Sequence, residues 1–382
     1  MTDFKIVFPE SSLGEVSPAY IESFTFVTDL NKLYAGAKVV FKNFCREAFN
    51  EIKTGMKVEF TLKTTGSDEG KSYTNYMRVL SFEKVPNTET SLVDYLNVTL
   101  ISSWYFVSAI QTKAYQGSIG EIVSSVFTQN FSSENFKTDF GATTDPARIR
   151  YQISEKSQDF LKRILKYGTV QNTPLYLYTD AKNTVNLKSL SDSLNGNVSS
   201  TLIPDLTETT EKGVSKNTTD IRVSNKVRLK NYKILTENQN SSSRQTTFFT
   251  VAGFVASQDV KGSVTTVNAE NNNSASDIAT PSLVRYMDWS YTPQDAIAIA
   301  TKDYYEKNLN AFSLVIETDG FALDAIPLGS LNKVILPFKG IKTSSGHEEN
   351  LGEGGYVVQH LEYIFSDNIS STKALMFLAR YN

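Results

Sequence analysis

The residues that could carry chemistry are few, and one group of them resembles a phosphate-binding loop. The segment Gly66–Ser72 reads GSDEGKS and places three residues between its glycines, where the phosphate-binding motif has four. Asp68 and Glu69 would repel a phosphate, and the segment leads into a strand pattern instead of the helix N-terminus that the motif requires. The pattern therefore predicts a polar turn.

The chain has few histidine and cysteine residues, which limits the chemistry that depends on them. Cys45 is the only cysteine, so no intrachain disulfide can form, and with two histidines a structural zinc site would need carboxylates. No G-x-S-x-G nucleophile motif is present. His347 in a glycine-bounded loop and His360 in a strand pattern favour structural positions over a His-dependent hydrolase. A glycosidase carboxylate pair stays an open alternative, because separation in space defines it. We expect no enzyme, cofactor or metal.

The most distinctive stretch is a basic strand over Ile221–Lys230. Its apolar residues fall on one face of a strand, and its cations fall on the other. Four cations on one sheet face repel each other unless water or a partner matches them. Two interpretations follow: a solvated face, or a docking strip for an acidic surface or a nucleic-acid backbone. The candidate interface residues are Arg222, Lys226, Arg228 and Lys230.

Length, charge and composition narrow the classes of protein to which the chain can belong. The chain has 382 residues and a formal net charge of −3, which predicts two or three domains and excludes the global basic charge of a sequence-reading nucleic-acid binder. No signal sequence or apolar run long enough to span a bilayer is present, so we expect a soluble, unprocessed protein with no membrane partner. Abundant Tyr, Phe, Ser, Thr and Asn with 10 prolines favour β-structure joined by polar loops.

Periodicity predicts strands first and a mixed section after them. Met56–Leu62 alternates between apolar and polar residues, as a half-buried antiparallel strand does. A capping box at Ser118–Glu121 predicts a helix to about Gln129, and Ser157 begins a second helix that Gly168 would end as a left-handed cap. The later part of the chain predicts a polar connector over 191–219 and two polar loops over 238–245 and 257–282. A helix that Thr292 caps follows, and strands return after Leu309.

The two ends of the chain resemble each other in spacing. Gly55 and Gly329 each open a strand, and a long aromatic strand and a last strand follow in each half. Tyr76 and Leu96 are nearly as far apart as Tyr356 and Leu375. One small antiparallel barrel built twice would explain this, and coincidental spacing of glycine-led strands is the alternative.

Several motifs, in order along the chain, resemble the baseplate hub proteins of contractile-tailed bacteriophages. Segment 154–164 is similar to the helix start shared by these hubs, late-control proteins and the VgrG proteins of type VI secretion. The other segments resemble the first barrel and the C-terminal half of the hubs; they are 23–27, 33–36, 292–298, 313–320, 327–329 and 355–358. The resemblance implies an α+β, predominantly β protein with two tube-like antiparallel β-barrels and a mixed α/β middle domain. Its barrel signature residues would be Gly55, Gly329, Gly355 and Tyr356.

The resemblance also implies a domain arrangement. Residues 1–105 would form the first barrel and 106–205 the middle domain. Residues 206–236 and 309–382 would form the second barrel, with 237–308 as an insertion that packs with the middle domain. Because the chain stops soon after the second barrel, we expect the spike to be a separate chain.

The implied function is structural, in the virion, for a protein made in the host cytoplasm. A homotrimer would present six similar barrels and adapt a sixfold tail tube to a threefold spike. Its partners would be copies of itself, the tail tube protein, the central spike protein, other baseplate proteins, and passing DNA and tape-measure protein without sequence-specific contact. The alternatives are a hub of a secretion or tailocin machine, and a carbohydrate-binding or carbohydrate-cleaving tail protein in which Trp104, Trp289 or tyrosines stack on sugars.

Overall fold

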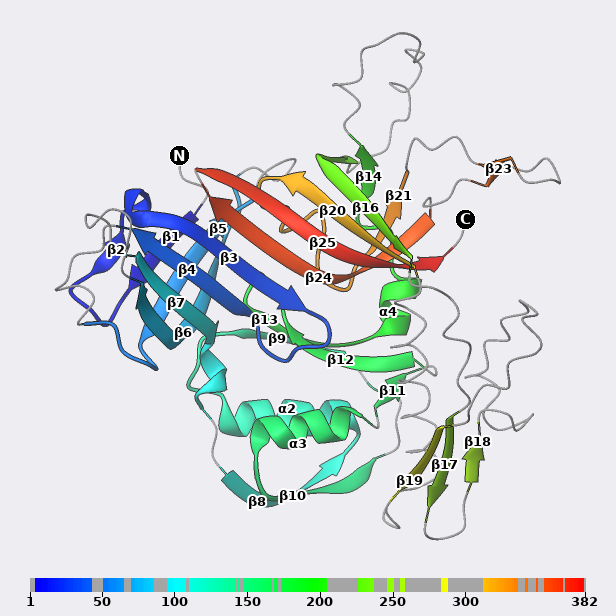
Figure 1. Cartoon of the computed structure of the whole chain (residues 1–382). Helices are drawn as coiled ribbons and strands as arrows, with labels where there is room; N and C mark the ends of the chain where they lie inside the picture. Colours follow the sequence, from blue (N-terminus) through cyan, green and yellow to red (C-terminus); the bar gives the residue numbers. More distant parts are fainter. Residues whose placement is uncertain are drawn as a thin grey trace.

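β-Strands dominate the chain, and one long sheet runs through the molecule (Figure 1). The computed structural model describes residues 4–42, 51–64, 70–85, 95–107, 110–141, 143, 147–166, 168–170, 173–204, 226–236, 246–250, 255–257, 283–287, 312–335, 341–342, 348–349, 354–366 and 368–380.

The N-terminal strands form a curled, half-barrel part of this sheet. They lie in the order β2-β1-β5-β6-β7-β4-β3, all antiparallel. Apolar residues alternate along each strand, so one face is buried; its ring contacts include Phe26 with Phe60 at a centroid distance of 4.9 Å. The elements are β1 (Phe4–Phe8), β2 (Gly14–Val16), η1 (Pro18–Tyr20), β3 (Ile21–Asp29), β4 (Gly36–Lys42), β5 (Lys57–Lys63), β6 (Ser72–Val85), β7 (Tyr95–Ser102) and η2 (Ser103–Tyr105).

The C-terminal strands continue the same 14-stranded sheet. The connection is antiparallel pairing of His360–Ser366 in β24 with Ser23–Asp29 in β3. The strands of both expected barrels therefore share one sheet. The elements are β14 (Thr201–Pro204), β15 (Lys226–Leu229), β16 (Asn231–Thr236), β20 (Phe312–Asp319), β21 (Leu331–Val334), β24 (Gly354–Ser366) and β25 (Ile369–Arg380).

One strand order occurs in both parts of the sheet. In the N-terminal part it is β5-β6-β7-β4-β3, and in the C-terminal part it is β21-β24-β25-β20-β16. Numbered by position in the chain, each run reads third, fourth, fifth, second, first, and each neighbouring pair is antiparallel. Both long strands also carry a register shift at the matching place, between Val79 and Ser81 of β6 and between Val358 and His360 of β24.

The turns that open β5 and β21 have the same hydrogen bonds. Met56 N–H donates to Lys53 O at 3.1 Å, and Ser330 N–H donates to Pro327 O at 3.1 Å. Each turn holds a glycine with positive φ, +86° at Gly55 and +75° at Gly329. Gly55 N–H donates to Val79 O at 2.8 Å, and Gly329 N–H donates to Val358 O at 2.9 Å. Val79 thus corresponds to Val358.

This correspondence differs by one residue from the spacing expected for the aromatic strands. Lys57 pairs with Arg78 as Leu331 pairs with Val357, so the counterpart of Tyr356 is Met77 and not Tyr76. The side chains alternate between faces, so a one-residue difference decides which face each residue occupies. Met77 and Tyr356 are both buried.

A mixed section packs against the buried face of the sheet. In Figure 1 it lies as layers, with β12 and β13 next to the large sheet, then α2 and α3, then β8 and β10. The helices share a second core with Trp104, Tyr115 and Phe131. The elements are β8 (Ile110–Gly117), α2 (Ile119–Asn130), β9 (Lys137–Phe140), β10 (Arg148–Lys156), α3 (Ser157–Leu165), β11 (Thr169–Val170), β12 (Thr173–Thr179), β13 (Thr184–Ser189) and α4 (Leu190–Asn195).

Helix ends test the local predictions. The Ser118–Glu121 capping box is present and begins α2, as expected. The second helix begins at Ser157 and ends at Leu165, but Gly168 is not a left-handed cap. A Cβ at Gly168 would lie 2.6 Å from Leu175 Cδ1, so this glycine allows close packing of β12.

The segment expected as a connector at 191–219 begins with regular structure. Most of α4 and all of β14 fall in it, because Ser189 and Asp192 form a capping box and Leu202 reaches the main core. Residues 205–219 and the helix expected after Thr292 lie outside the described residues.

Short strands complete the described part. They are β17 (Thr246–Thr250), β18 (Val255–Ser257) and β19 (Leu283–Met287) in one sheet, and β22 (Ile341–Lys342) and β23 (Glu348–Glu349) in another. Among the described residues, no helix has the length and apolar character needed to cross a bilayer.

Candidate functional site

The predicted basic strand lies at an edge of the large sheet. Lys226 and Arg228 belong to β15, which pairs in parallel with β14, Lys226 opposite Thr201 and Arg228 opposite Ile203. Lys230 follows the strand, and its Nζ lies 3.5 Å from Asp319 Oδ1 with both side chains at least half exposed. Arg222 lies outside the described residues, so an interface role for the four cations stays a prediction.

The four barrel signature residues have structural positions. Gly55 and Gly329 form the two turns described above. Gly355 and Tyr356 pair with β21, and Tyr356 is fully buried. Gly55 and Gly329 thus shape the turns that open β5 and β21, and Gly355 and Tyr356 belong to a strand pair.

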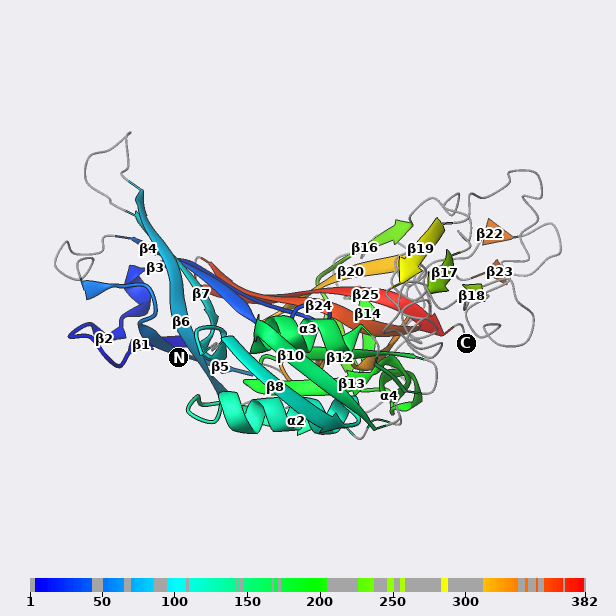
Figure 2. The same ribbon diagram turned by 90° about the horizontal axis from the view of Figure 1, so that it is seen from below.

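A better candidate site is the half-exposed face of the sheet along β6-β7-β4-β3-β24-β25-β20-β16. Strand alternation divides the side chains, with residues such as Phe26 and Tyr363 toward the core and residues such as Val27 and Glu362 toward the opposite face (Figure 2 shows the sheet edge-on). We call the half-exposed surface, on the side of the sheet away from the core, the open face. Its residues include Thr25, Val27, Lys38, Thr99, Lys233, Val315, Glu317, Glu362, Ile364, Lys373 and Leu375.

Charges of opposite sign lie next to each other on β24, β25 and β20 of the open face. In strand register, Lys373 of β25 stands opposite Glu362 of β24 on one side and Glu317 of β20 on the other. Opposite charges in neighbouring positions stabilise a sheet and leave little net field. Such a surface lacks the concentrated positive charge that holds a polyanion.

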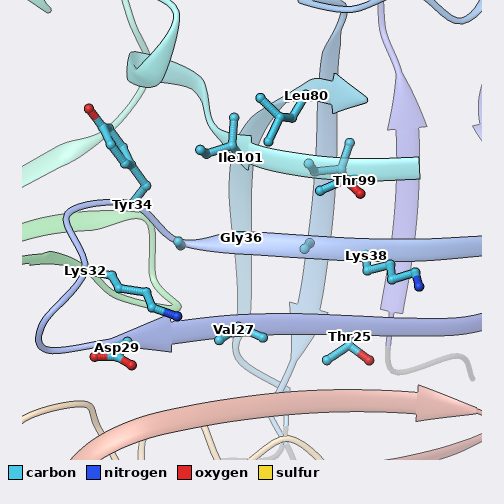
Figure 3. Close-up of a pocket in the computed structure, with 13 residues that line it drawn as sticks. Thr25, Val27, Asp29, Lys32, Tyr34, Gly36, Lys38, Leu80, Thr99 and Ile101 are labelled. Carbon is cyan, nitrogen blue, oxygen red and sulfur yellow. The ribbon is translucent and has the colours of Figure 1, made fainter. Parts of the chain in front are cut away.

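A shallow hollow of about 480 Å³ lies on the open face (Figure 3). Side chains of four neighbouring strands form its floor, with Tyr34 and Lys32 from the β3–β4 loop at one end. The floor carries Thr25, Val27, Gly36, Lys38, Leu80, Thr99 and Ile101. Aliphatic and threonine side chains supply contact area and hydroxyl groups but no nucleophile paired with a base.

The junction of the two sheet parts holds a histidine between two carboxylates. His360 Nδ1 lies 3.0 Å from Asp29 Oδ2, and Nε2 lies 3.3 Å from Glu362 Oε1. The hydrogen bond to Asp29 is the largest of the effects that raise the pKa of His360. Burial acts to raise the pKa of Asp29, yet its hydrogen bonds to His360 and to the Asn31 amide leave that pKa below its usual value. No local sequence pattern indicates this pair, because the two residues are far apart in the chain.

Among the described residues, few features support the alternatives of metal binding or stacking on sugars. These residues contain no group of three His, Cys, Asp or Glu side chains able to hold a metal ion. Trp104, a candidate for stacking on sugars, is 1% exposed and packs on Tyr34, Phe127 and Phe131. Trp289 and His347 lie outside the described residues.

These features define a β-rich protein that presents a long sheet face. No family model matches the sequence, and no curated protein matches it. The similarities found are structural. A tail protein from Neisseria meningitidis superposes with a TM-score of 0.61 at 12% identity, over 98% of this chain and 96% of that one.

Two further structures give the same result. The 43 kDa tail protein of prophage MuSo2 from Shewanella oneidensis superposes with a TM-score of 0.59 at 10% identity, over 99% of this chain and 98% of that one. An Escherichia coli component of the type VI secretion system, described as structurally similar to bacteriophage tail proteins, superposes with a TM-score of 0.52 at 11% identity. The match covers 99% of this chain and 77% of that one. The chain thus has the fold of these phage tail and type VI secretion proteins, which agrees with the family resemblance and confirms a predominantly β structure. The duplication into two barrels and the separate middle domain stay predictions.

Proposed function

We propose that this chain is a structural component of a phage baseplate or tail tip, in which copies surround a central channel. The observation that carries the proposal is the long sheet with one strand order in both parts, in a chain that has the fold of tail proteins. A sheet that curls and continues from one half to the other is suited to building the wall of a tube.

The recurring strand order supports a homotrimer that adapts one symmetry to another. If residues 1–105 and the combination of 206–236 with 309–382 are two equivalent tube-like units, three copies present six similar units. Such a ring can contact a sixfold tail tube on one side and a threefold spike on the other, with other baseplate proteins around it. Residues 106–205 and 237–308 would lie outside the tube-like units.

The open face is the surface that we assign to the channel. Its neighbouring charges of opposite sign suit passing DNA and tape-measure protein, which must move along the wall without being held. A wall of this kind needs no catalytic residue, and we propose that the chain is not an enzyme.

Mass measurement of the purified full chain, alone and with its tail tube and spike partners, tests the proposal. We expect a trimer, and a three-dimensional reconstruction should place the open face around the channel. A chain that stays monomeric with both partners present would contradict it.

A second candidate is the equivalent hub of a secretion machine. The observation that favours it is the likeness to the type VI secretion component, at a TM-score of 0.52. Both candidates place the chain in a ring between a tube and a spike. Purification of the assembled particle separates them, since a virion contains packaged DNA and a secretion machine does not.

A further inference from the structure

One edge of β24 has two partner strands in succession. Along Gly354–Val357 its neighbour is β21, and along His360–Ser366 its neighbour is β3. The register shift between Val358 and His360 separates the two stretches. The second stretch connects the C-terminal part of the sheet to the N-terminal part.

β6 is the counterpart of β24 and repeats the first half of this arrangement. Its neighbour along Ser72–Arg78 is β5, the counterpart of β21, and its register shift follows at the matching place. Beyond the shift, β24 pairs with β3. Along the matching stretch of β6, at Ser81, Glu83 and Val85, the described residues contain no strand in the equivalent position. These three residues are exposed, while their counterparts His360, Glu362 and Ile364 are half-buried.

β16 shows the complementary situation. Its counterpart β3 lies between β4 and β24. β16 pairs with β20, the counterpart of β4, and the described residues place no strand on its other side. Lys233 on this strand is exposed and Leu235 is half-buried.

The two incomplete edges cannot complete each other within one copy. β6 and β16 lie at the two ends of the run β6-β7-β4-β3-β24-β25-β20-β16, well apart in Figure 1. An edge strand with a free side is a template for pairing with another chain. Pairing between two different edges is head-to-tail, and it closes into a ring when the rotation between copies allows.

We propose that β6 of one copy pairs antiparallel with β16 of the next copy, repeating the β24–β3 junction between chains. This contact rests on the proposed function and deepens it by naming the strands that join the copies. The register follows from the counterparts. Glu362 opposite Val27 becomes Glu83 opposite Leu235, and Ile364 opposite Thr25 becomes Val85 opposite Lys233.

The side chains suit this register. Glu83 and Lys233 become diagonal neighbours of opposite charge, and Val85 places its aliphatic side chain beside the stem of Lys233. Glu83 repeats the glutamate of its counterpart Glu362, and Leu235 repeats the aliphatic character of Val27. Burial of Val85, which is 36% exposed in the single copy, would remove apolar surface from water.

Intermolecular disulfides test both the contact and its register. On a Cys45→Ser background, we would combine Val85→Cys with Lys233→Cys, a directly opposed pair within the Cα separation that a disulfide spans. Oxidation of the assembled protein should convert most of it to covalent oligomers that end at the size of the ring. The matched control is Val85→Cys with Leu235→Cys, displaced by two residues, which should cross-link at least tenfold less.

The outcomes distinguish this contact from the proposed function. A ring by mass measurement without cross-linking at Val85 and Lys233 would overturn the contact and leave the proposed function intact. Stronger cross-linking in the displaced control would overturn the register. A chain that never forms an oligomer would overturn both.

Hydrogen exchange on the unmodified chain covers the case in which the cysteine variants fail to fold. In the ring, amides of β16 should exchange at least tenfold more slowly than in the dissociated subunit, while those of the paired strands β8 and β10 should not change. Equal exchange of β16 in the ring and in the subunit would overturn the contact.

Discussion

His360 and Asp29 form a 3.0 Å contact between Nδ1 and Oδ2 across the only junction that directly connects the two parts of the sheet in the described residues. The contact joins β24 to β3 by side chains as well as by backbone pairing. Its strength depends on charge, since a protonated imidazole beside a carboxylate is a stronger partner than a neutral one. The junction is therefore sensitive to pH.

The sign of this pH dependence follows from the two pKa shifts. The folded pKa of His360 lies above its ordinary value of 6.5, so its stabilising contribution is complete below that value and is lost as the pH rises through the raised pKa. The pKa of Asp29 lies below 3.8, so its contribution is present above that value and is lost as the pH falls. The junction should be most stable in mildly acidic solution.

Replacement of His360 by glutamine should remove the part of the pH dependence of stability that comes from the imidazole. We expect the loss of unfolding free energy in His360→Gln to be about 1 kcal/mol greater near pH 5.5 than near pH 8.5. Urea unfolding at both pH values measures it. Glu362→Gln is the control and should change the dependence less, because its contact with the ring is longer. A loss that is the same at both pH values would refute the prediction.

A side chain at position 329 should destabilise the protein. Its φ is +75°, and a Cβ there would lie 3.1 Å from Tyr178 Oη and 3.3 Å from Leu30 Cδ2. Gly329→Ala should therefore lower the unfolding free energy by about 1–2 kcal/mol. Gly36→Ala is the matched control, since Gly36 lacks positive φ and its nearest atom would be 3.7 Å away. Thermal unfolding compares the two, and equal melting temperatures would contradict the prediction.

A partly buried ion pair connects the mixed section to the N-terminal sheet. Arg78 Nη2 lies 2.7 Å from Glu134 Oε1, and Arg78 Nη1 donates to Gly55 O at 3.0 Å. Glu134→Gln leaves the arginine charge without its carboxylate and should cost about 2 kcal/mol of unfolding free energy. Glu15→Gln breaks the exposed pair with Lys5 and should cost less than about 0.5 kcal/mol. Similar costs by urea unfolding would show that burial does not strengthen the first pair.

The basic strand gives a test between two interpretations. If it contacts another subunit or the tube, Arg228→Glu with Lys230→Glu should abolish assembly and leave the fold intact. Lys230 already lies near Asp319, so reversal there also places two negative charges together. Circular dichroism checks the fold and mass measurement checks assembly. Normal assembly by the variant would identify the strand as a solvated face.

Local pattern alone predicted several elements. Alternation over Met56–Leu62 predicted β5, and the Ser118 capping box predicted the start of α2, because strand pleat and helix caps depend on neighbouring residues. The glycines at Gly55 and Gly329 predicted two similar strand openings, since a positive φ is a local requirement that glycine meets most easily.

Tertiary structure decided which strands are neighbours. No local pattern indicates that β24 pairs with β3, and this pairing alone brings His360 to Asp29. It also decided that Met77, and not Tyr76, corresponds to Tyr356, because register is fixed by pairing across the sheet. The sequence by itself thus determined turns, caps and alternation, which are local properties. The open face and the two incomplete edges exist only once distant strands pair, because pairing between distant strands is set by the packing of the whole chain.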